Sequence, residues 1–486
     1  DNNKFIVLIN SGNYDFQNRK SLDTSIFACD KFMKNKKTIV FTSLAENQTR
    51  YFIKLAQYFK EKENDVCIIC FHDSSVQLVD AAGIEVYSVY SVIDLLNGDL
   101  KNPCIDEWNL FTSHERLVFQ NYNSDKLDLK MKKYFSAILF ILSKLNEKNA
   151  NKVVLIQEFG GFISLVSSYY AAKHLDIDNI FIEPSFFTGR FFLSRNTFTS
   201  PKISNTYVKH NDLLNEYLKH AQEKRVVVIP EKDKLHYRTP LSKLYDQKNI
   251  KRVFTKLLDK FYYKREEEFN HIAVHITLHV KMLITKLRLK KYYSNINTSK
   301  KIIYFPLHVP NDASLTIRSP EYHDQYAILD YLCRILPKGY TLCFKEHPAL
   351  IGSIDYYRIK KILTTYDNII LLSPDISNYR VIESSEMVIT INSKTGAEAL
   401  LMSKNTVVLG DAFYKNCPWV KSIKTLDGIR EIMKYINSHF VNPSDDDINY
   451  FYGNVWDSSY PGELYSEDLT KINDSCVSIE QYIEIE

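Results

Sequence analysis

The chain has 486 residues, of which 45% are hydrophobic and 25% are charged, and its formal net charge is +4. This length exceeds one ordinary hydrophobic core and predicts two domains, while the small net charge gives no indication of nucleic acid as a partner. No stretch approaches the roughly 20 apolar residues of a membrane span and no signal peptide opens the chain, so we expect a cytoplasmic protein.

The eight cysteines are scattered along the chain. Cys67 and Cys70 have the spacing of a metal or redox pair, but they lie in the apolar run DVCIICF and no second pair follows. Buried thiols of a cytosolic protein are the favoured interpretation.

Apolar runs and helical periodicity alternate over the first 200 residues, which is typical of an α/β domain of the Rossmann type. Helices are expected within residues 44–63, 105–150 and 163–174. Strands are expected at Lys4–Asn10, Thr38–Ser43, Asp65–Phe71, Gly83–Tyr87, Asn151–Gln157 and Asn179–Glu183. No GxGxxG motif opens this domain, so the dinucleotide-binding pattern is missing.

Residues 201–300 interrupt this alternation with a helical, basic segment that has little strand signal beyond Arg225–Ile229. Between Lys251 and Tyr293, eleven Lys and Arg residues stand against four Asp and Glu residues, a net of +7. Such a segment can lie on an anionic membrane, which would place the protein at the inner face of the cytoplasmic membrane. A solvated connector whose apolar side chains pack on a domain is the alternative.

A second α/β unit is predicted over residues 301–430, followed by a helical tail over 431–486 that packs back on the first domain. A helix is expected over residues 322–336. Strands are expected at Lys301–Pro306, Thr341–Phe344, Ile369–Leu372, Met387–Ile391 and Thr406–Leu409. The predicted fold is therefore α/β, with two Rossmann-like domains facing a cleft and a helical insertion between them. Because GxxxxGK[ST], HExxH and GxSxG are absent, P-loop NTPases, zincin proteases and α/β-hydrolases are disfavoured.

Two polar clusters follow strands of the second domain, where ligands bind in parallel sheets. One is Lys345-Glu346-His347-Pro348, and the other runs from Asn392 to Glu398 and opens a helix. The free N–H groups and the positive dipole end of a helix suit a phosphate. We therefore predict half of a nucleotide-binding cleft here.

Each residue of these clusters has a functional and a structural interpretation. His347 can donate to a phosphate and stabilise charge on a departing nucleotide, or it can satisfy a loop carbonyl; Lys345 and Glu346 beside it are weaker candidates. Ser393, Thr395 and Gly396 permit close approach of a phosphate, or they simply cap the helix.

The loop between Leu307 and Pro320 is longer and more polar than a minimal connection requires, which favours a ligand role over an ordinary solvated loop. Its candidate ligand-binding residues are His308, Asn311, Asp312, Ser314 and Arg318.

Several segments together resemble the bacterial capsule-polysaccharide synthesis family, GT-B glycosyltransferases that include the β-Kdo transferases. The matching segments are YFPLHVPNDASLTIRSP, FKEHP and INSKTGAEAL, and more loosely Gln157–Gly161 with Ile180–Phe187. The His-Pro pair and the later Ser/Thr-Gly-x-Glu-Ala helix are also similar to those of sialyltransferases and of polymerases that use CDP-glycerol. The resemblance implies a nucleotide-sugar donor, CMP-linked, a glycan or glycolipid acceptor, and no metal cofactor.

Two departures from the family pattern bear on the donor. His308 stands where Gln is common, and Glu183-Pro184-Ser185 stands where the β-Kdo enzymes have an acidic pair before Gly-Phe. A donor other than CMP-Kdo therefore stays open, including sialic-acid-like nonulosonates and UDP-sugars.

The resemblance also implies roles for individual residues. In GT-B enzymes the base that takes the acceptor proton usually comes from the first domain; Glu158 is the first candidate, Glu183 the second and Asp15 the third. Glu398 would hold the nucleotide ribose, and Arg318 would pair with a carboxylate of an ulosonic acid. The acceptor would approach Gly12, Gly160 and Gly161, although ordinary turns explain these glycines equally well. The run Asp445–Asp447 lies in a loop-like tail and is not expected to bind metal.

The leading hypothesis is thus an inverting, metal-independent glycosyltransferase of surface polysaccharide synthesis that uses Kdo or another ulosonic acid. The alternatives are a CDP-polyol phosphotransferase of the teichoic-acid type, a sugar-nucleotide 2-epimerase and a non-enzymatic capsule assembly subunit. Retention of His347, Ser393 and Glu398 disfavours the last of these.

Overall fold

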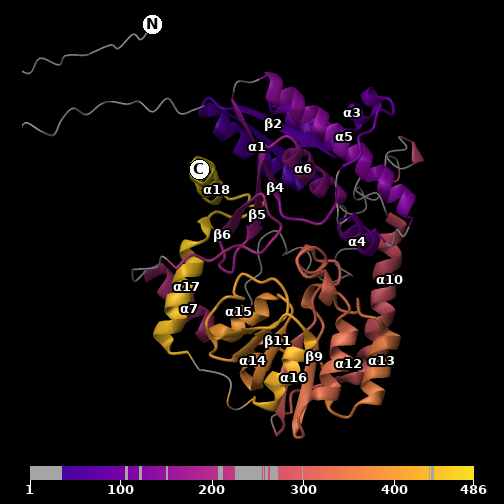
Figure 1. Cartoon of the computed structure of the whole chain (residues 1–486), viewed down its shortest axis with the longest axis vertical. Coiled ribbons are helices and arrows are strands. Elements are labelled where there is room, and N and C mark those ends of the chain that lie inside the picture. The colour runs from indigo at the N-terminus through magenta and orange to yellow at the C-terminus, as the bar shows by residue number, and fades with distance from the viewer. Residues whose placement is uncertain are drawn as a thin grey trace, which may run out of the picture. The chain divides into compact units, whose positions relative to one another are not determined.

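The computed structural model describes residues 36–103, 105, 108–119, 123–148, 151–205, 212–224, 254, 257, 261–262, 272–297, 299–436, 438 and 443–485. The predicted strands Lys4–Asn10 and Arg225–Ile229, together with Gly12 and Asp15, lie outside these residues. Residues 37–486 form one compact unit, which holds all the described helices and strands (Figure 1).

The first sheet has seven strands in the order β14-β6-β5-β4-β1-β2-β3. Neighbouring strands from β5 through β3 pair in parallel, whereas β6 is antiparallel to β5 and β14 is antiparallel to β6. The bounds are β1 Lys37–Ser43, β2 Asp65–Cys70, β3 Glu85–Ser88, β4 Lys152–Glu158, β5 Asp178–Pro184, β6 Arg190–Arg195 and β14 Tyr460–Pro461.

Helices cover both faces of the first sheet, which explains why its strands are continuous apolar runs. Side chains of β1 alternate between two cores: Ile39 and Phe41 pack with α1, and Val40 packs with α5 and α6. The helices are α1 Glu46–Glu61, α2 Asp73–Ala81, α3 Val89–Leu96, α4 Trp108–Phe119, α5 Ser124–Lys148 and α6 Ile163–His174. The next helix, α7 Asp212–Lys224, packs instead in the apolar cluster around Phe187.

Two predictions for this domain need correction. The strand series does not end at Glu183, because β6 follows β5 through a tight turn at Gly189, whose φ is +72°. The single helical region predicted over 105–150 contains two helices, α4 and α5.

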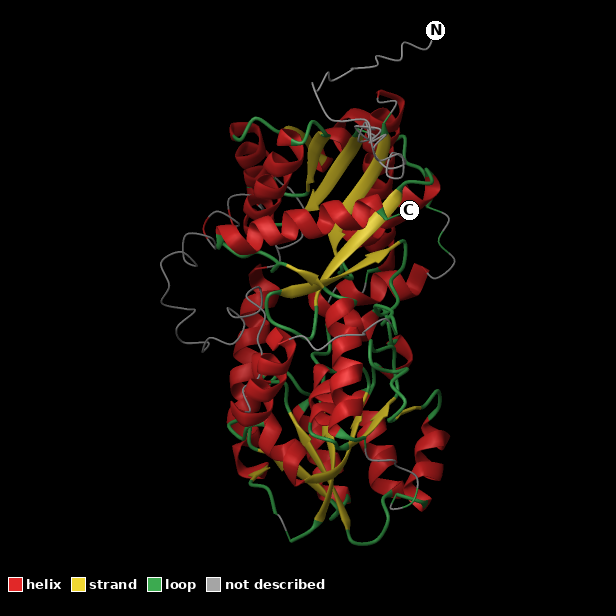
Figure 2. Ribbon diagram, turned by 90° about the vertical axis from the view of Figure 1, so that its left-hand side faces the viewer, coloured by secondary structure: helices red, strands yellow, loops and turns green. Residues whose placement is uncertain are grey.

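The second sheet is parallel throughout, in the order β13-β12-β11-β8-β9-β10-β7. Its strands are β7 Tyr293–Ser294, β8 Lys301–Pro306, β9 Tyr340–Lys345, β10 Ile369–Leu372, β11 Ser385–Thr390, β12 Asn405–Val408 and β13 Val420–Ser422. Figure 2 shows the two sheets as separate layers, each with helices around it.

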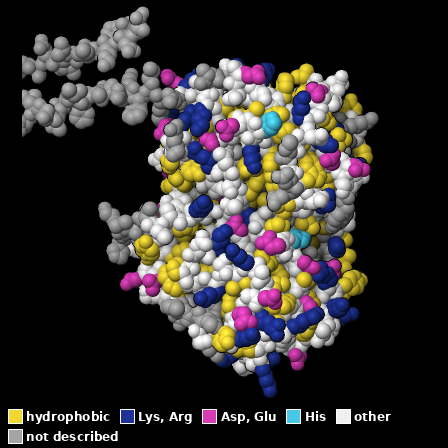
Figure 3. Space-filling view, viewed as in Figure 1, with side chains coloured by type: hydrophobic (Ala, Val, Ile, Leu, Met, Phe, Trp, Pro, Cys, Tyr) yellow, Lys and Arg dark blue, Asp and Glu magenta, His cyan; other side chains and the backbone are white. Residues whose placement is uncertain are grey.

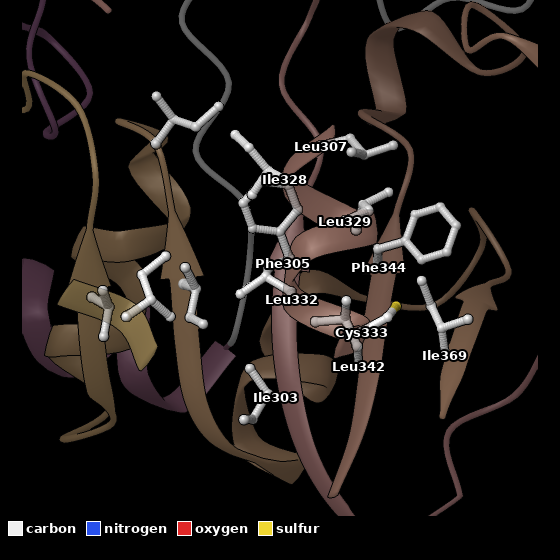
Figure 4. Close-up of a cluster of buried hydrophobic side chains, with 14 of the residues drawn as sticks. Ile303, Phe305, Leu307, Ile328, Leu329, Leu332, Cys333, Leu342, Phe344 and Ile369 are labelled. Atoms are coloured by element: carbon white, nitrogen blue, oxygen red, sulfur yellow. The ribbon is translucent and has the colours of Figure 1, made fainter. Parts of the chain in front are cut away.

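The core of the second domain lies between this sheet and its helices. Figure 4 shows Phe305 of β8 and Phe344 of β9 beside Leu329 and Leu332 of the helix Gln325–Ile335. The helices are α10 Ile272–Leu289, η2 Lys290–Tyr292, α11 Ala313–Thr316, η3 Pro320–Tyr322, α12 Gln325–Ile335, η4 Pro348–Leu350, α13 Tyr356–Thr365, α14 Asn378–Ser384, α15 Lys394–Leu401 and α16 Leu426–Lys434.

The last residues return to the first domain. Helix α17 (Asp445–Asp457) is followed by β14 and then by α18 (Leu469–Glu484), which packs on α1. The Tyr58 hydroxyl donates to Glu480 Oε2 at 2.6 Å, and Lys37 Nζ donates to the Ile483 carbonyl at 3.0 Å. The run Asp445–Asp447 is not a loop: it forms the first turn of α17, where Ser444 and Asp447 make a capping box and the carboxylates suit the helix dipole.

The predicted pair of Rossmann-like domains is therefore confirmed, while the predicted domain limits stay predictions.

An apolar cluster joins the two domains: Phe186, Phe187 and Phe192 of the β5–β6 hairpin region pack with residues of α15 and α17. Within the described part of the chain, no helix is both long enough and apolar enough to cross a membrane.

Candidate functional site

The two polar segments predicted to bind the donor meet at the carboxyl edge of the second sheet. Asn392, just after β11, donates its backbone N–H to His308 Nε2 at 3.2 Å and its side-chain amide to the Ser314 carbonyl at 2.6 Å. The same amide lies 3.1 Å from Ser319 Oγ. Asn392 therefore ties the long loop after β8 to the segment that opens α15, although about 80 residues separate them.

His308 is a neutral imidazole in this setting. Its backbone is clamped by Gln325, which accepts from the His308 N–H at 2.7 Å and donates to its carbonyl at 3.2 Å. Burial, reinforced by the nearby His347, lowers the pKa of His308 to about 4, although the Asp312 carboxylate opposes this shift. Because Nε2 accepts a hydrogen bond, the proton is assigned to Nδ1.

The Nδ1 atom of His308 is buried and has no partner at hydrogen-bond geometry among the described residues. The Gln325 side chain and the Pro306 carbonyl are near enough to favour the protonated ring. A buried donor without a well-aligned acceptor costs free energy, so this ring nitrogen is under-satisfied.

His347 lies at the end of β9, where Pro348 begins the short helix η4. Its Nδ1 accepts from the Ala349 N–H at 3.3 Å, which assigns the proton of the neutral ring to Nε2. The side chain is half-buried. Strand β9 pairs with β8, which precedes His308, so the two histidines follow neighbouring strands at this edge of the sheet.

The start of α15 is capped by the protein itself. Ser393 Oγ accepts from the Thr395 N–H at 3.1 Å, and the Ser393 carbonyl accepts from the Gly396 N–H at 3.0 Å. The Ser393 N–H donates to Thr390 Oγ1 at 3.2 Å. A phosphate at this helix start therefore has to displace the Ser393 hydroxyl to reach the Thr395 N–H, while the dipole of the helix remains favourable to it.

Gly396 makes room for a protein side chain. A Cβ at this position would lie 2.3 Å from the Tyr414 hydroxyl oxygen, and that hydroxyl donates to the Ser393 carbonyl. Packing of Tyr414 thus explains this glycine, and the predicted phosphate approach is not needed to account for it.

Three charged residues of the predicted donor site are buried and bound to protein groups. Lys345 donates to the Ile376 carbonyl, and Glu346 accepts from the Tyr293 hydroxyl at 2.6 Å. Glu398 accepts from the Asn378 amide. Burial lowers the pKa of Lys345 and raises the pKa of Glu346, and it raises the pKa of Glu398 to about 7.

Arg318 and Glu183, predicted to serve separate roles, are paired with each other. The Arg318 guanidinium donates to both carboxylate oxygens, at 2.8 Å and 2.5 Å, and it stacks over the Phe159 ring at 3.7 Å. Only 6% of the Arg318 side chain and 15% of the Glu183 side chain are exposed. A donor carboxylate at Arg318, or proton transfer at Glu183, would each have to compete with this bidentate pair.

Glu158 lies at the end of β4, on the first domain. Its Oε2 accepts from Gln48 Nε2 at 3.0 Å and from the Tyr465 hydroxyl. Tyr465 comes from the C-terminal return and has a φ of +60°, in the left-handed region that non-glycine residues rarely adopt. Residues from two other, distant parts of the chain therefore hold this carboxylate in position.

Asp312, in the loop after β8, and Gly160 and Gly161, in the loop after β4, each have a local structural role. Asp312 caps α11 by accepting from the Ser314 N–H at 2.7 Å. A Cβ at Gly160 would lie 2.6 Å from Leu165, and one at Gly161 would lie 2.6 Å from the His114 ring. Close packing accounts for both glycines without an acceptor.

The structure adds a pocket that the sequence did not predict. It opens where the start of α15 meets the β5–β6 turn, and it encloses about 320 Å³, part of which is open solvent. Lys394 lines it and donates to the Ser185 carbonyl at 2.7 Å. Its lining residues are Pro184, Ser185, Phe187, Thr188, Gly189, Arg190, Phe191, Lys394, Glu463 and Leu464.

Part of this pocket had a signal in the sequence and part had none. The sequence indicates the Ile180–Phe187 segment and the Asn392–Glu398 cluster as parts of a site. Glu463 and Leu464, in contrast, come from the C-terminal return, which carries no motif. Among the described residues, no three His, Cys, Asp or Glu side chains gather as metal ligands would.

The two Rossmann-like domains, with polar residues gathered at the carboxyl edge of the second sheet, form a fold of the GT-B type. Residues 207–418 match the family described as "Capsule polysaccharide biosynthesis protein". This match confirms the predicted resemblance to the bacterial capsule polysaccharide synthesis family over the segment that carries FKEHP and INSKTGAEAL.

Comparison with individual proteins gives partial matches. The protein FixF of Sinorhizobium fredii is 30% identical over 133 residues, which are 27% of this chain and about a third (32%) of that protein. The β-Kdo 2,7-transferase KpsC of Thermosulfurimonas dismutans has 15% identity over 71% of this chain and 89% of that chain, with a TM-score of 0.34. A UDP-GlcNAc 2-epimerase from Neisseria meningitidis has 12% identity over 92% of this chain and all of that one, with a TM-score of 0.29. At these scores the superpositions assign no activity to the chain.

Proposed function

We propose that the protein is an inverting, metal-independent glycosyltransferase of surface polysaccharide synthesis. It transfers a sugar, Kdo or another ulosonic acid, from a CMP-linked donor to a glycan or glycolipid acceptor. The family match over residues 207–418 supports the biosynthetic setting, and the arrangement of residues at the edge of the second sheet supports the chemistry.

The observation that carries the proposal is that Asn392 joins His308 to the start of α15, while His347 follows β9, the neighbour of β8 in the sheet. The His347 ring N–H, the dipole of α15 and the Lys394 ammonium suit an anion that gains charge during the reaction. A nucleoside monophosphate leaving an anomeric carbon is such an anion.

In the proposed reaction the acceptor hydroxyl attacks the anomeric carbon while the bond from that carbon to the phosphate oxygen breaks. The His347 Nε2–H donates to the departing phosphate, and Glu158 takes the acceptor proton. Gln48 and Tyr465 position Glu158 through the hydrogen bonds they donate to its Oε2. The Arg318–Glu183 pair makes Glu183 the weaker choice of base, because its carboxylate would have to leave the guanidinium first.

The donor assignment is tested with the intact protein and three nucleotides. CMP should raise the melting temperature of the second domain more than UMP or GMP does, because a ligand that binds only the folded state at 100 times its Kd adds about 2.7 kcal/mol of stability. Equal shifts with all three nucleotides would remove the cytidine assignment. Mass spectrometry of donor hydrolysis across CMP-sugars then identifies the sugar.

The role of His347 is tested with two variants. His347→Ala removes the ring, and His347→Asn keeps an acceptor for the Ala349 N–H while losing the Nε2–H donor. Both should lower transfer by about 10²-fold or more, the usual effect of losing one such donor, with little change in melting temperature. His72→Ala, at the residue before α2 in the first domain, is the control and should transfer normally. Near-normal turnover of His347→Asn would exclude the proposed donation.

A further inference from the structure

Helix α10 presents a row of large aliphatic side chains to solvent. They are Ile276, Val280, Leu283, Ile284 and Leu287, and between 43% and 65% of each is exposed. Because successive residues of an α-helix are about 100° apart, these five fall within an arc of about 100°. We call this arc the outer face of α10.

The opposite side of α10 packs on the second domain and fixes the direction of the outer face. Thr285 and Leu289 are buried, and Leu289 belongs to the core of that domain. A Cβ at Gly352 would lie 2.1 Å from the Met282 carbonyl oxygen, so the loop after η4 contacts the helix backbone directly. The helix therefore has two apolar sides, and only one of them has a partner within the described structure.

Basic residues flank the outer face. Residues 272–292 contain no Asp or Glu, and their cationic side chains lie beside the aliphatic arc or just beyond its end. These are Lys281, Lys286, Arg288, Lys290 and Lys291, which are all exposed. The half-buried Tyr292 and Tyr293 follow them. At the edge where Figure 1 draws α10, Figure 3 shows hydrophobic and Lys or Arg side chains next to one another.

We propose that the outer face of α10 binds the surface of an anionic lipid bilayer, with the helix lying in the plane of the interface. The aliphatic side chains enter the boundary between headgroups and acyl chains, and the flanking Lys and Arg side chains reach the lipid phosphates. The helix does not span the bilayer, since with three Lys and Arg residues it is not apolar enough to cross a membrane. The absence of acidic side chains from the helix favours an anionic lipid surface over a protein partner of mixed charge.

The proposal is tested by flotation of the full chain with vesicles of phosphatidylcholine alone and of phosphatidylcholine with about 30% phosphatidylglycerol, whose headgroups give the surface a negative potential. We expect binding to the anionic vesicles, little binding to the neutral ones, and loss of binding as salt screens the lysines. The double variant Leu283→Gln/Leu287→Gln should weaken binding by about tenfold or more, and Lys286→Gln/Lys290→Gln should do the same.

Matched controls separate a membrane role from a folding defect. Leu95→Gln/Leu469→Gln removes two leucines that are 68% and 74% exposed elsewhere on the protein, and it should bind as the parent does. All variants should keep the parent's melting temperature, because each altered side chain is exposed. Equal binding to neutral vesicles, or unchanged binding of Leu283→Gln/Leu287→Gln, would overturn the proposal. So would self-association without lipid that this variant abolishes, because the outer face would then join two copies of the chain.

Discussion

Replacement of Glu398 by Gln should make the second domain more stable at alkaline pH and nearly unchanged at acid pH. Burial raises the pKa of Glu398 from 4.5 to about 7 in the folded protein. Between these two values the folded state keeps a proton that the unfolded state has lost, so the contribution of this group to stability falls as pH rises through 7. Gln keeps the acceptor for the Asn378 amide and has no charge to bury.

The size of the effect follows from the two pKa values. Their difference is about 2.5, and each pKa unit is worth about 1.36 kcal/mol, so the whole effect is about 3.4 kcal/mol. Roughly 2.5 kcal/mol of it falls between pH 5 and pH 8.5. For a domain of this size each kcal/mol shifts the melting temperature by about 2–4 °C, so the gap between variant and parent should widen by about 5–10 °C over that range.

Differential scanning calorimetry of both proteins at several pH values measures this gap. His308 contributes in the opposite direction, because burial lowers its pKa to about 4 and stability from this group is lost as pH falls below 6.5. That contribution is common to both proteins and cancels in their difference. Glu321→Gln, an exposed position on η3, is the control and should follow the parent. A difference in melting temperature that stays constant from pH 5 to pH 8.5 would refute the conclusion that burial keeps Glu398 protonated.

Two further predictions concern packing. Arg318→Ala should cost about 3–5 kcal/mol of stability, because it leaves the Glu183 carboxylate buried without its partner. The double variant Arg318→Ala/Glu183→Gln should recover much of this loss. If urea unfolding shows that the free-energy changes of the two single variants simply add in the double variant, the pairing is contradicted. Gly396→Ala should cost about 1–3 kcal/mol through its clash with the Tyr414 hydroxyl and ring. It should cost less in a Tyr414→Leu background, which removes both; the same penalty in both backgrounds would place the strain elsewhere.

Strands β1–β5 and β8–β12 could be predicted because helices cover both faces of each sheet and leave continuous apolar runs in the sequence. The very short strands β7, β13 and β14 have no such run and were missed. Strand β6 was missed because it is a short antiparallel addition whose pairing depends on a turn at Gly189. The polar clusters after β9 and β11 were predicted to share one edge, and Asn392 does join the second of them to the loop after β8.

The direction of each side chain in those clusters could not be predicted. The His347 side chain is half-buried, whereas the side chain of its neighbour Glu346 is buried against Tyr293. Successive residues after a strand point to different sides, and only the three-dimensional neighbours decide which side meets solvent. The Arg318–Glu183 pair lies beyond local patterns altogether, because 135 residues separate its members.

The return of α18 to the first domain bears on the order in which the protein is made. Leu464, Ile472 and Ile479 belong to the same core as Ile39 and Phe41 of β1, so the ribosome must synthesise nearly the entire second domain before that core can close. The earliest strands to emerge thus wait longest for their covering helix, with apolar surface open in the meantime. Heterologous production should for this reason respond to slower translation or to chaperones that hold nascent chains.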